Sequence, residues 1–135
     1  MTQLNHIGIA VQDLPGLKKL FSLLNIQVTH TEDVPDQGVK THFLPVGAKG
    51  AHLEFLEVVD PGGVVAQFIK KRGPGIHHLS FTVEKGKLDE ICKKIASEGY
   101  RLVYEKPRSG AQKMRINFIH PASCNGILIE LMEPA

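Results

Sequence analysis

Apolar and polar residues alternate with a period of two at two related places in the chain. The segment His6–Val11 reads His-Ile-Gly-Ile-Ala-Val, and the segment His78–Val83 reads His-Leu-Ser-Phe-Thr-Val. Strict alternation is typical of a strand that buries one face and leaves the other for different use. The two segments therefore predict a pair of equivalent strands, one in each half of the chain.

A helical pattern follows each of these strands. Apolar residues are spaced at i, i+3, i+4 and i+7 over Leu17–Leu24 and again over Leu88–Ile95, which predicts two amphipathic helices. Pro15 lies near a suitable helix start, and Gly99 is a suitable C-terminal cap for the second helix. Cys92 is part of the second apolar stripe, so we expect it in the core.

Three strand-like runs follow each helix. They cover about 26–34, 38–46, 51–58, 100–105, 114–119 and 126–132. The fold class is therefore α+β with two βαβββ repeats. At 135 residues the chain has the length of one domain, with repeat one over about 1–60, a linker over about 61–75 and repeat two over about 76–135. The linker is expected to carry a short helix over 64–71.

The two repeats also place ligand-type side chains at matching positions. Strand parity puts His6 and His78 on the small, polar faces of their strands, and the apolar faces take the helices. Later in each repeat, Leu-Glu-Phe-Leu-Glu matches Ile-Glu-Leu-Met-Glu, which aligns Glu54 with Glu130. Each of these carboxylates is flanked by apolar residues, where an uncompensated charge costs several kcal/mol. A metal ion compensates that cost.

One helix cannot cover both faces of a four-stranded sheet, so the open faces of the two repeats are expected to line a shared cleft. Two imidazoles and two carboxylates make a donor set acceptable to Zn²⁺, Co²⁺, Mn²⁺ or Ni²⁺. The remaining histidines lack this symmetry and are interpreted as structural or surface residues: His30, His42, His52, His77 and His120.

Composition excludes several other classes of protein. The formal net charge is +2, with acidic and basic residues spread along the chain, so we expect no nucleic-acid partner. No apolar run approaches the length of a membrane span, and the chain has neither a leader-like segment nor cysteine spacing typical of a disulfide framework or thiolate zinc site. A cytoplasmic location is the default expectation.

Duplicated βαβββ units with His and Glu at these places resemble the vicinal oxygen chelate superfamily of glyoxalase I, extradiol dioxygenases, bleomycin resistance proteins and methylmalonyl-CoA epimerase. The resemblance covers essentially the whole chain and is strongest to the epimerase family. Five motifs carry it: Leu4–Val11, Val34–Val39, Gly75–Leu79, Phe118–Pro121 and Gly126–Leu131. It implies a cup-like mixed sheet around a metal site.

Carried over to matching positions, the resemblance implies the metal ligands His6, Glu54, His78 and Glu130, with Glu130 also a candidate base. It implies that Arg115 lies near an acyl-CoA substrate and that the protein is a homodimer. The implied activity is epimerisation of (R)- and (S)-methylmalonyl-CoA by α-proton abstraction through a metal-stabilised enediolate. From the repeat itself we infer that Glu54 and Glu130 approach the metal from opposite sides, which makes Glu54 a candidate second catalytic carboxylate.

Departures from the family pattern leave alternatives open. Some epimerases have Gln in place of Glu54, some have a third-strand Glu where Thr41 stands, and a Lys often occurs in place of Ala122. A lactoylglutathione lyase of the glyoxalase I type is the second interpretation, although Ala10 replaces the Arg that is typical there. A non-catalytic binding protein of the bleomycin resistance type is the third; such proteins commonly lack the four ligands.

Overall fold

The computed structural model describes residues 1–47 and 50–135. Its strands are β1 (Gln3–Val11), β2 (His30–Val34), β3 (Val39–Pro45), β4 (His52–Val58), β5 (Gly75–Thr82), β6 (Arg108–Ser109), β7 (Arg115–Ile119) and β8 (Leu128–Glu133). Its α-helices are α1 (Leu14–Ser22), α2 (Val64–Arg72) and α3 (Leu88–Ser97). Short 3-10 turns cover Pro35–Gln37, Ala111–Lys113 and Pro121–Ser123. Within the described residues, no helix has the length and apolar character needed to cross a membrane.

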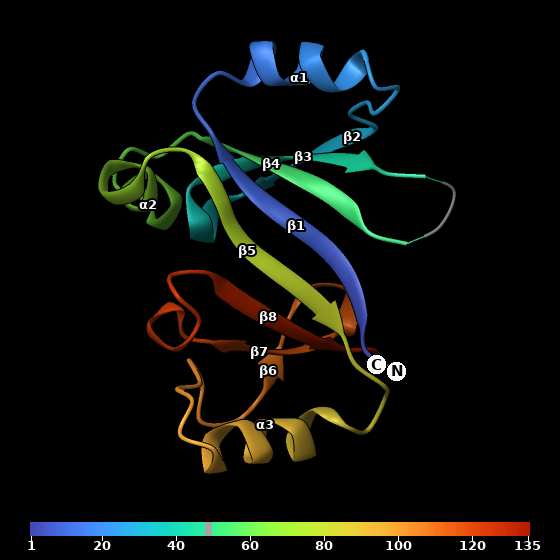
Figure 1. Ribbon diagram of the computed structural model, residues 1–135, viewed down its shortest axis with the longest axis vertical. Coiled ribbons are helices and arrows are strands. Elements are labelled where there is room, and N and C mark those ends of the chain that lie inside the picture. Colours follow the sequence, from blue (N-terminus) through green and yellow to red (C-terminus); the bar gives the residue numbers. More distant parts are fainter. Residues whose placement is uncertain (48–49) are drawn as a thin grey trace. The chain divides into compact units, whose positions relative to one another are not determined.

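The strands form a mixed sheet in the order β2-β3-β4-β1-β5-β8-β7-β6 (Figure 1). In the first repeat β1 pairs in parallel with β4, and β4 pairs antiparallel with β3. In the second repeat β5 pairs in parallel with β8, and β8 pairs antiparallel with β7. The predicted α+β class and the βαβββ order of elements are therefore confirmed. The chain divides into two compact units, an N-terminal unit (His6–His77) and a C-terminal unit (Met1–Asn5 with His78–Ala135). The assignment of the whole chain to a single domain stays a prediction.

In the N-terminal unit, α1 covers the apolar face of the strands, as the alternation predicts. Val11 and Phe55 are buried there, with Phe21 of the helix edge-on to Phe55 at 5.3 Å between ring centroids. The helix is shorter than its apolar spacing predicts, because it ends at Ser22. Leu24 lies beyond the helix and is 62% exposed, and Leu20 is 54% exposed although it lies inside the helix. The expectation that the whole stripe is buried is therefore wrong.

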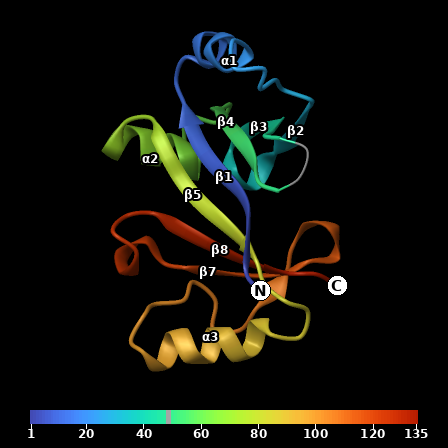
Figure 2. The same cartoon turned by 45° about the vertical axis from the view of Figure 1, so that its right-hand side comes forward.

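Helix α2 packs on the opposite face of the same strands, at one end of the face that carries His6 (Figure 2). Ala10, Leu56 and Val65 are almost completely buried in this contact. The predicted helix in the linker is thus confirmed. Its apolar residues close the end of a strand face that is otherwise lined by small and polar side chains.

In the C-terminal unit, α3 packs on β5, β7 and β8 through Leu88, Cys92 and Leu131, all buried. The expectation that Cys92 belongs to the core is confirmed, and burial raises the pKa of its thiol. The predicted strand over 100–105 is wrong, because the segment forms an isolated antiparallel bridge, Leu102 with Ile119, in place of a strand. The buried side chain of Asn117 accepts a hydrogen bond from the Tyr104 amide and donates one to the Tyr104 carbonyl, so these backbone groups do not join a ladder.

Candidate metal centre

His6 and Glu54 come together in the N-terminal unit because β1 and β4 pair in parallel. The register sets Gly8 opposite Glu54, so His6 lies two residues away along β1 and points to the same face. The Nδ1 atom of His6 is 3.2 Å from Oε2 of Glu54, and the two side chains are only 9% and 12% exposed. The structure therefore brings the first two predicted ligands into contact on one face.

The spacing of these two donor atoms suits a shared ion. Imidazole nitrogen and carboxylate oxygen lie about 2.0–2.2 Å from Zn²⁺ and similar ions. Two neighbouring ligands of one ion are consequently separated by about 2.8 Å in octahedral geometry to about 3.5 Å in tetrahedral geometry. The separation of 3.2 Å between His6 and Glu54 falls in this interval. The pair thus fits a divalent metal both in donor chemistry and in spacing.

The C-terminal unit repeats this arrangement on β5 and β8. Here the parallel register sets Ser80 opposite Glu130, and His78 lies two residues before Ser80, just as His6 lies two residues before Gly8. His78 is buried and Glu130 is half-buried. Each unit therefore presents one His and one Glu on the same face of two neighbouring parallel strands. The ligand and base roles of these residues stay predictions.

His52 is a neighbour of this centre that the sequence interpretation left among the structural histidines. Its Nε2 is 2.8 Å from Oε2 of Glu54, and its ring stacks on that of His6 with centroids 5.1 Å apart. The signal for this contact was present in the sequence, because His52 and Glu54 are two residues apart on one strand and must share a face.

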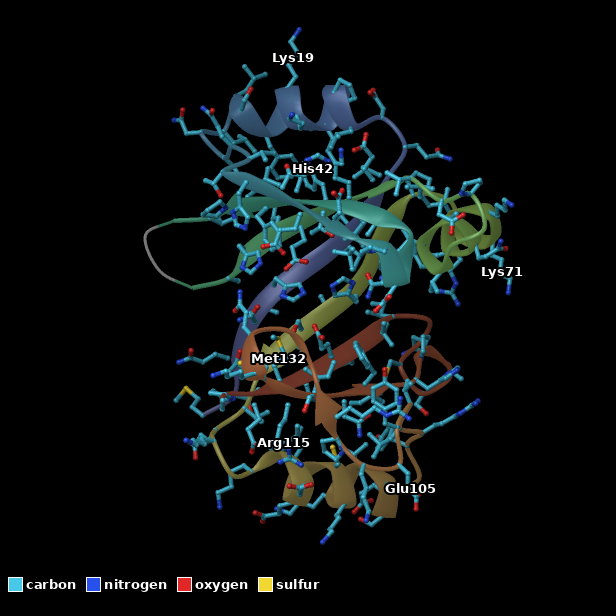
Figure 3. All side chains as sticks on the ribbon, turned by 180° about the vertical axis from the view of Figure 1, so that it is seen from behind. Lys19, His42, Lys71, Glu105, Arg115 and Met132 are labelled. Atoms are coloured by element: carbon cyan, nitrogen blue, oxygen red, sulfur yellow. The ribbon has the colours of Figure 1, made fainter. Side chains whose placement is uncertain are left out.

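Two other histidines contact residues other than His6 and Glu54. His42 lies on the α1 side of the N-terminal unit (Figure 3), where its ring nitrogens contact Thr31 Oγ1 at 2.9 Å and Glu57 Oε1 at 3.1 Å. His77 is buried edge-on against Phe68 of α2, and this burial lowers the pKa of its imidazole. Both contacts support the structural interpretation of these residues.

Arg115, the predicted substrate contact, lies on the α3 side of the C-terminal unit (Figure 3). It pairs with Glu133 across the β7–β8 ladder, and Glu133 and Glu130 point to opposite faces because they are three residues apart. Its guanidinium donates to both carboxylate oxygens of Asp89, at 2.9 and 3.1 Å, and to Glu133 at 2.9 Å. The structure therefore does not bring Arg115 and Glu130 to one face, and the substrate role of Arg115 stays a prediction.

These ion pairs shift the pKa values of both acids downward. Burial raises the pKa of Glu133, but hydrogen bonds from the Leu88 amide and from Arg115 outweigh it, so the net shift is below the usual range. The hydrogen bond from Arg115 likewise lowers the pKa of Asp89. A carboxyl with a lowered folded-state pKa stabilises the fold above its unfolded-state pKa, and this contribution is lost as the pH falls through the folded-state pKa.

Replacing Arg115 by leucine is expected to lower the free energy of unfolding by about 3 kcal/mol at pH 7, because the buried Glu133 carboxylate loses its counter-charge. The loss should shrink on acidification between about pH 5 and 3, where the carboxyls become protonated. Urea unfolding across this range measures both effects. The exposed Arg101 of the same unit provides the control Arg101→Leu. Equal losses in the two variants would contradict the structural role of Arg115.

Comparison with known proteins places these features in context. Residues 5–118 match the family model of the Glyoxalase/Bleomycin resistance protein/Dioxygenase superfamily. The ethylmalonyl-CoA/methylmalonyl-CoA epimerase of Cereibacter sphaeroides is 31% identical, over 96% of each chain. A crystal structure of methylmalonyl-CoA epimerase from Mycobacterium tuberculosis is 42% identical over 98% of this chain and 88% of its own, with a TM-score of 0.81. A Streptomyces coelicolor methylmalonyl-CoA epimerase in complex with 2-nitronate-propionyl-CoA is 32% identical over 100% of this chain and 99% of its own, with a TM-score of 0.81.

Proposed function

Because the chain belongs to the glyoxalase/bleomycin resistance protein/dioxygenase superfamily, and within it to the methylmalonyl-CoA epimerases, we propose that it interconverts (R)- and (S)-methylmalonyl-CoA. The observation in this chain that carries the proposal is the repeated His–Glu pair, His6 with Glu54 and His78 with Glu130, on neighbouring parallel strands. Such pairs supply both metal ligands and a carboxylate base, which are the groups that abstraction of a proton next to a thioester requires.

One divalent ion, Co²⁺, Zn²⁺, Mn²⁺ or Ni²⁺, would be held by His6, Glu54, His78 and Glu130. In support, the 3.2 Å between His6 and Glu54 suits two ligands of one ion, and the parallel register gives His78 and Glu130 the same positions in the C-terminal unit. A bound ion would stabilise the negative charge that develops on the thioester oxygen.

The chain's own carboxylates would move the protons. Glu130 would remove the α-proton, so that the C–H electron pair shifts towards the thioester oxygen. Glu54, which has the same register position in the first repeat, would return a proton to the other face of the carbon and so invert it.

The proposal has two further parts: a cytoplasmic location, which is the default expectation from the sequence, and a homodimer, which the resemblance implies. The chain's weakly positive net charge of +2 agrees with an absence of nucleic-acid partners. Light scattering on the purified protein tests the dimer directly, because a monomer and a dimer of a 14.9 kDa chain differ twofold in mass.

The purified, metal-defined protein is expected to exchange the α-hydrogen of methylmalonyl-CoA for deuterium in deuterated water and to racemise a single epimer. Proton NMR follows the exchange, and the methylglyoxal–glutathione adduct is assayed in parallel. Turnover of the glutathione adduct alone would make the protein a lyase of the glyoxalase I type. Binding of either compound without turnover would favour the non-catalytic alternative.

A further inference from the structure

Glu54 contacts the imidazoles of His52 and His6, and the contact with His52 is the shorter one. The Nε2 atom of His52 lies 2.8 Å from Glu54 Oε2, within the range of about 2.7–2.9 Å that is typical of charge-assisted hydrogen bonds. An ionised carboxylate only accepts hydrogen bonds, so the imidazole must donate through Nε2–H. This interaction is local to β4, since the two residues are two positions apart on one strand and share a face.

The imidazole of His52 is itself held by aromatic neighbours. It stacks on His6 with ring centroids 5.1 Å apart and an interplanar angle of 29°, and Phe43 contacts it at 5.6 Å and 38°. Phe43 in turn stacks on His30 at 4.1 Å and 7°. The donor direction of Nε2–H is therefore set by packing on both sides of the ring, which lowers the entropy lost when the hydrogen bond forms.

We propose that His52 is a positioning residue: its Nε2–H holds the Glu54 carboxylate in the orientation in which it binds the divalent ion. The inference rests on the proposed function. A carboxylate offers about four lone-pair sites, so one hydrogen bond from His52 leaves others for the metal. Partners that orient a metal ligand typically change metal affinity by about 10- to 100-fold.

Two substitutions separate the hydrogen bond from the packing. His52→Phe keeps an aromatic ring between His6 and Phe43 but has no donor. His52→Gln keeps an N–H group near the position of Nε2. In calorimetric titration of the full chain with Co²⁺, the dissociation constant of His52→Phe is expected to rise about 10- to 100-fold. That of His52→Gln should stay much nearer the wild-type value. Circular dichroism and thermal unfolding establish that each variant is folded.

His30 provides the matched control. It also stacks on Phe43, but the carboxylate near its Nε2 is that of Glu32, at 3.8 Å. His30→Phe should therefore bind Co²⁺ as the wild type does. A second control tests the route of the effect: in a Glu54→Ala background, His52→Phe should cause little further loss, because the carboxylate that it positions is gone.

Several results would overturn the inference. If His52→Phe binds Co²⁺ with wild-type affinity, the hydrogen bond does not position Glu54, although the proposed function would stand. His52 acts by another route if His52→Gln binds Co²⁺ as weakly as His52→Phe does. The same conclusion follows if the losses of Co²⁺ affinity from His52→Phe and Glu54→Ala simply add in the double variant. A wild-type protein that binds no divalent ion would overturn both the metal site and the role of His52. The NMR assay tests the racemisation of methylmalonyl-CoA independently of that result.

Discussion

Replacing Glu130 by glutamine is expected to slow epimerisation by at least about 100-fold while much of the metal binding remains. Glutamine keeps a side-chain oxygen that can bind an ion, but it is not an effective base, and a positioned general base contributes about 10² to 10⁴ in rate. Glu130 lies opposite Ser80 on the face of β8 that points away from α3, so the change leaves the helix-facing core untouched. Racemisation kinetics and Co²⁺ titration measure the two quantities.

Glu105, which is exposed in the same unit, provides the control Glu105→Gln and should retain wild-type activity. The matching change Glu54→Gln identifies the second proton donor. If Glu54 is the opposing base, this variant should still exchange the α-hydrogen of one epimer with deuterated water but fail to invert it. Full activity of Glu130→Gln would remove Glu130 from the role of base, and wild-type racemisation by Glu54→Gln would leave Glu54 as a ligand only.

Removal of the metal is expected to abolish activity, with a loss of at least about 10³-fold, equivalent to about 4 kcal/mol of transition-state stabilisation. Re-addition of Co²⁺, Zn²⁺, Mn²⁺ or Ni²⁺ should restore it. His6→Ala and His78→Ala should each weaken metal binding severely, because each removes one direct bond to the ion. Elemental analysis after dialysis against a chelator, combined with racemisation assays, measures occupancy and rate together.

His42→Gln is the control for these variants, since His42 is also a buried strand histidine but lies on the α1 face. It should keep full metal affinity. Metal-stripped protein with full activity would contradict the role of the ion. Unchanged metal affinity in His6→Ala would mean that the contact between His6 and Glu54 is structural.

Much of the candidate centre was predictable from the sequence because it depends on local periodicity. Side chains in a strand alternate between faces, so the pattern around His6 and around His78 specifies which residues share a face without knowledge of the partner strands. The repeat then aligned Glu54 with Glu130, and the parallel register confirmed that these two residues have equivalent places in the two halves. The buried position of Cys92 followed in the same way from helical spacing.

Tertiary structure decided the features that depend on which groups meet across the chain. Local spacing extended the apolar stripe of the first helix to Leu24, but the helix ends at Ser22. The predicted strand over 100–105 is reduced to an isolated bridge between Leu102 and Ile119, and the side chain of Asn117 hydrogen-bonds both backbone groups of Tyr104. Arg115 faces α3 because the β7–β8 register sets it opposite Glu133. Composition and spacing carry no information on such pairings, since a strand's register is set by its partner and by the core that both cover.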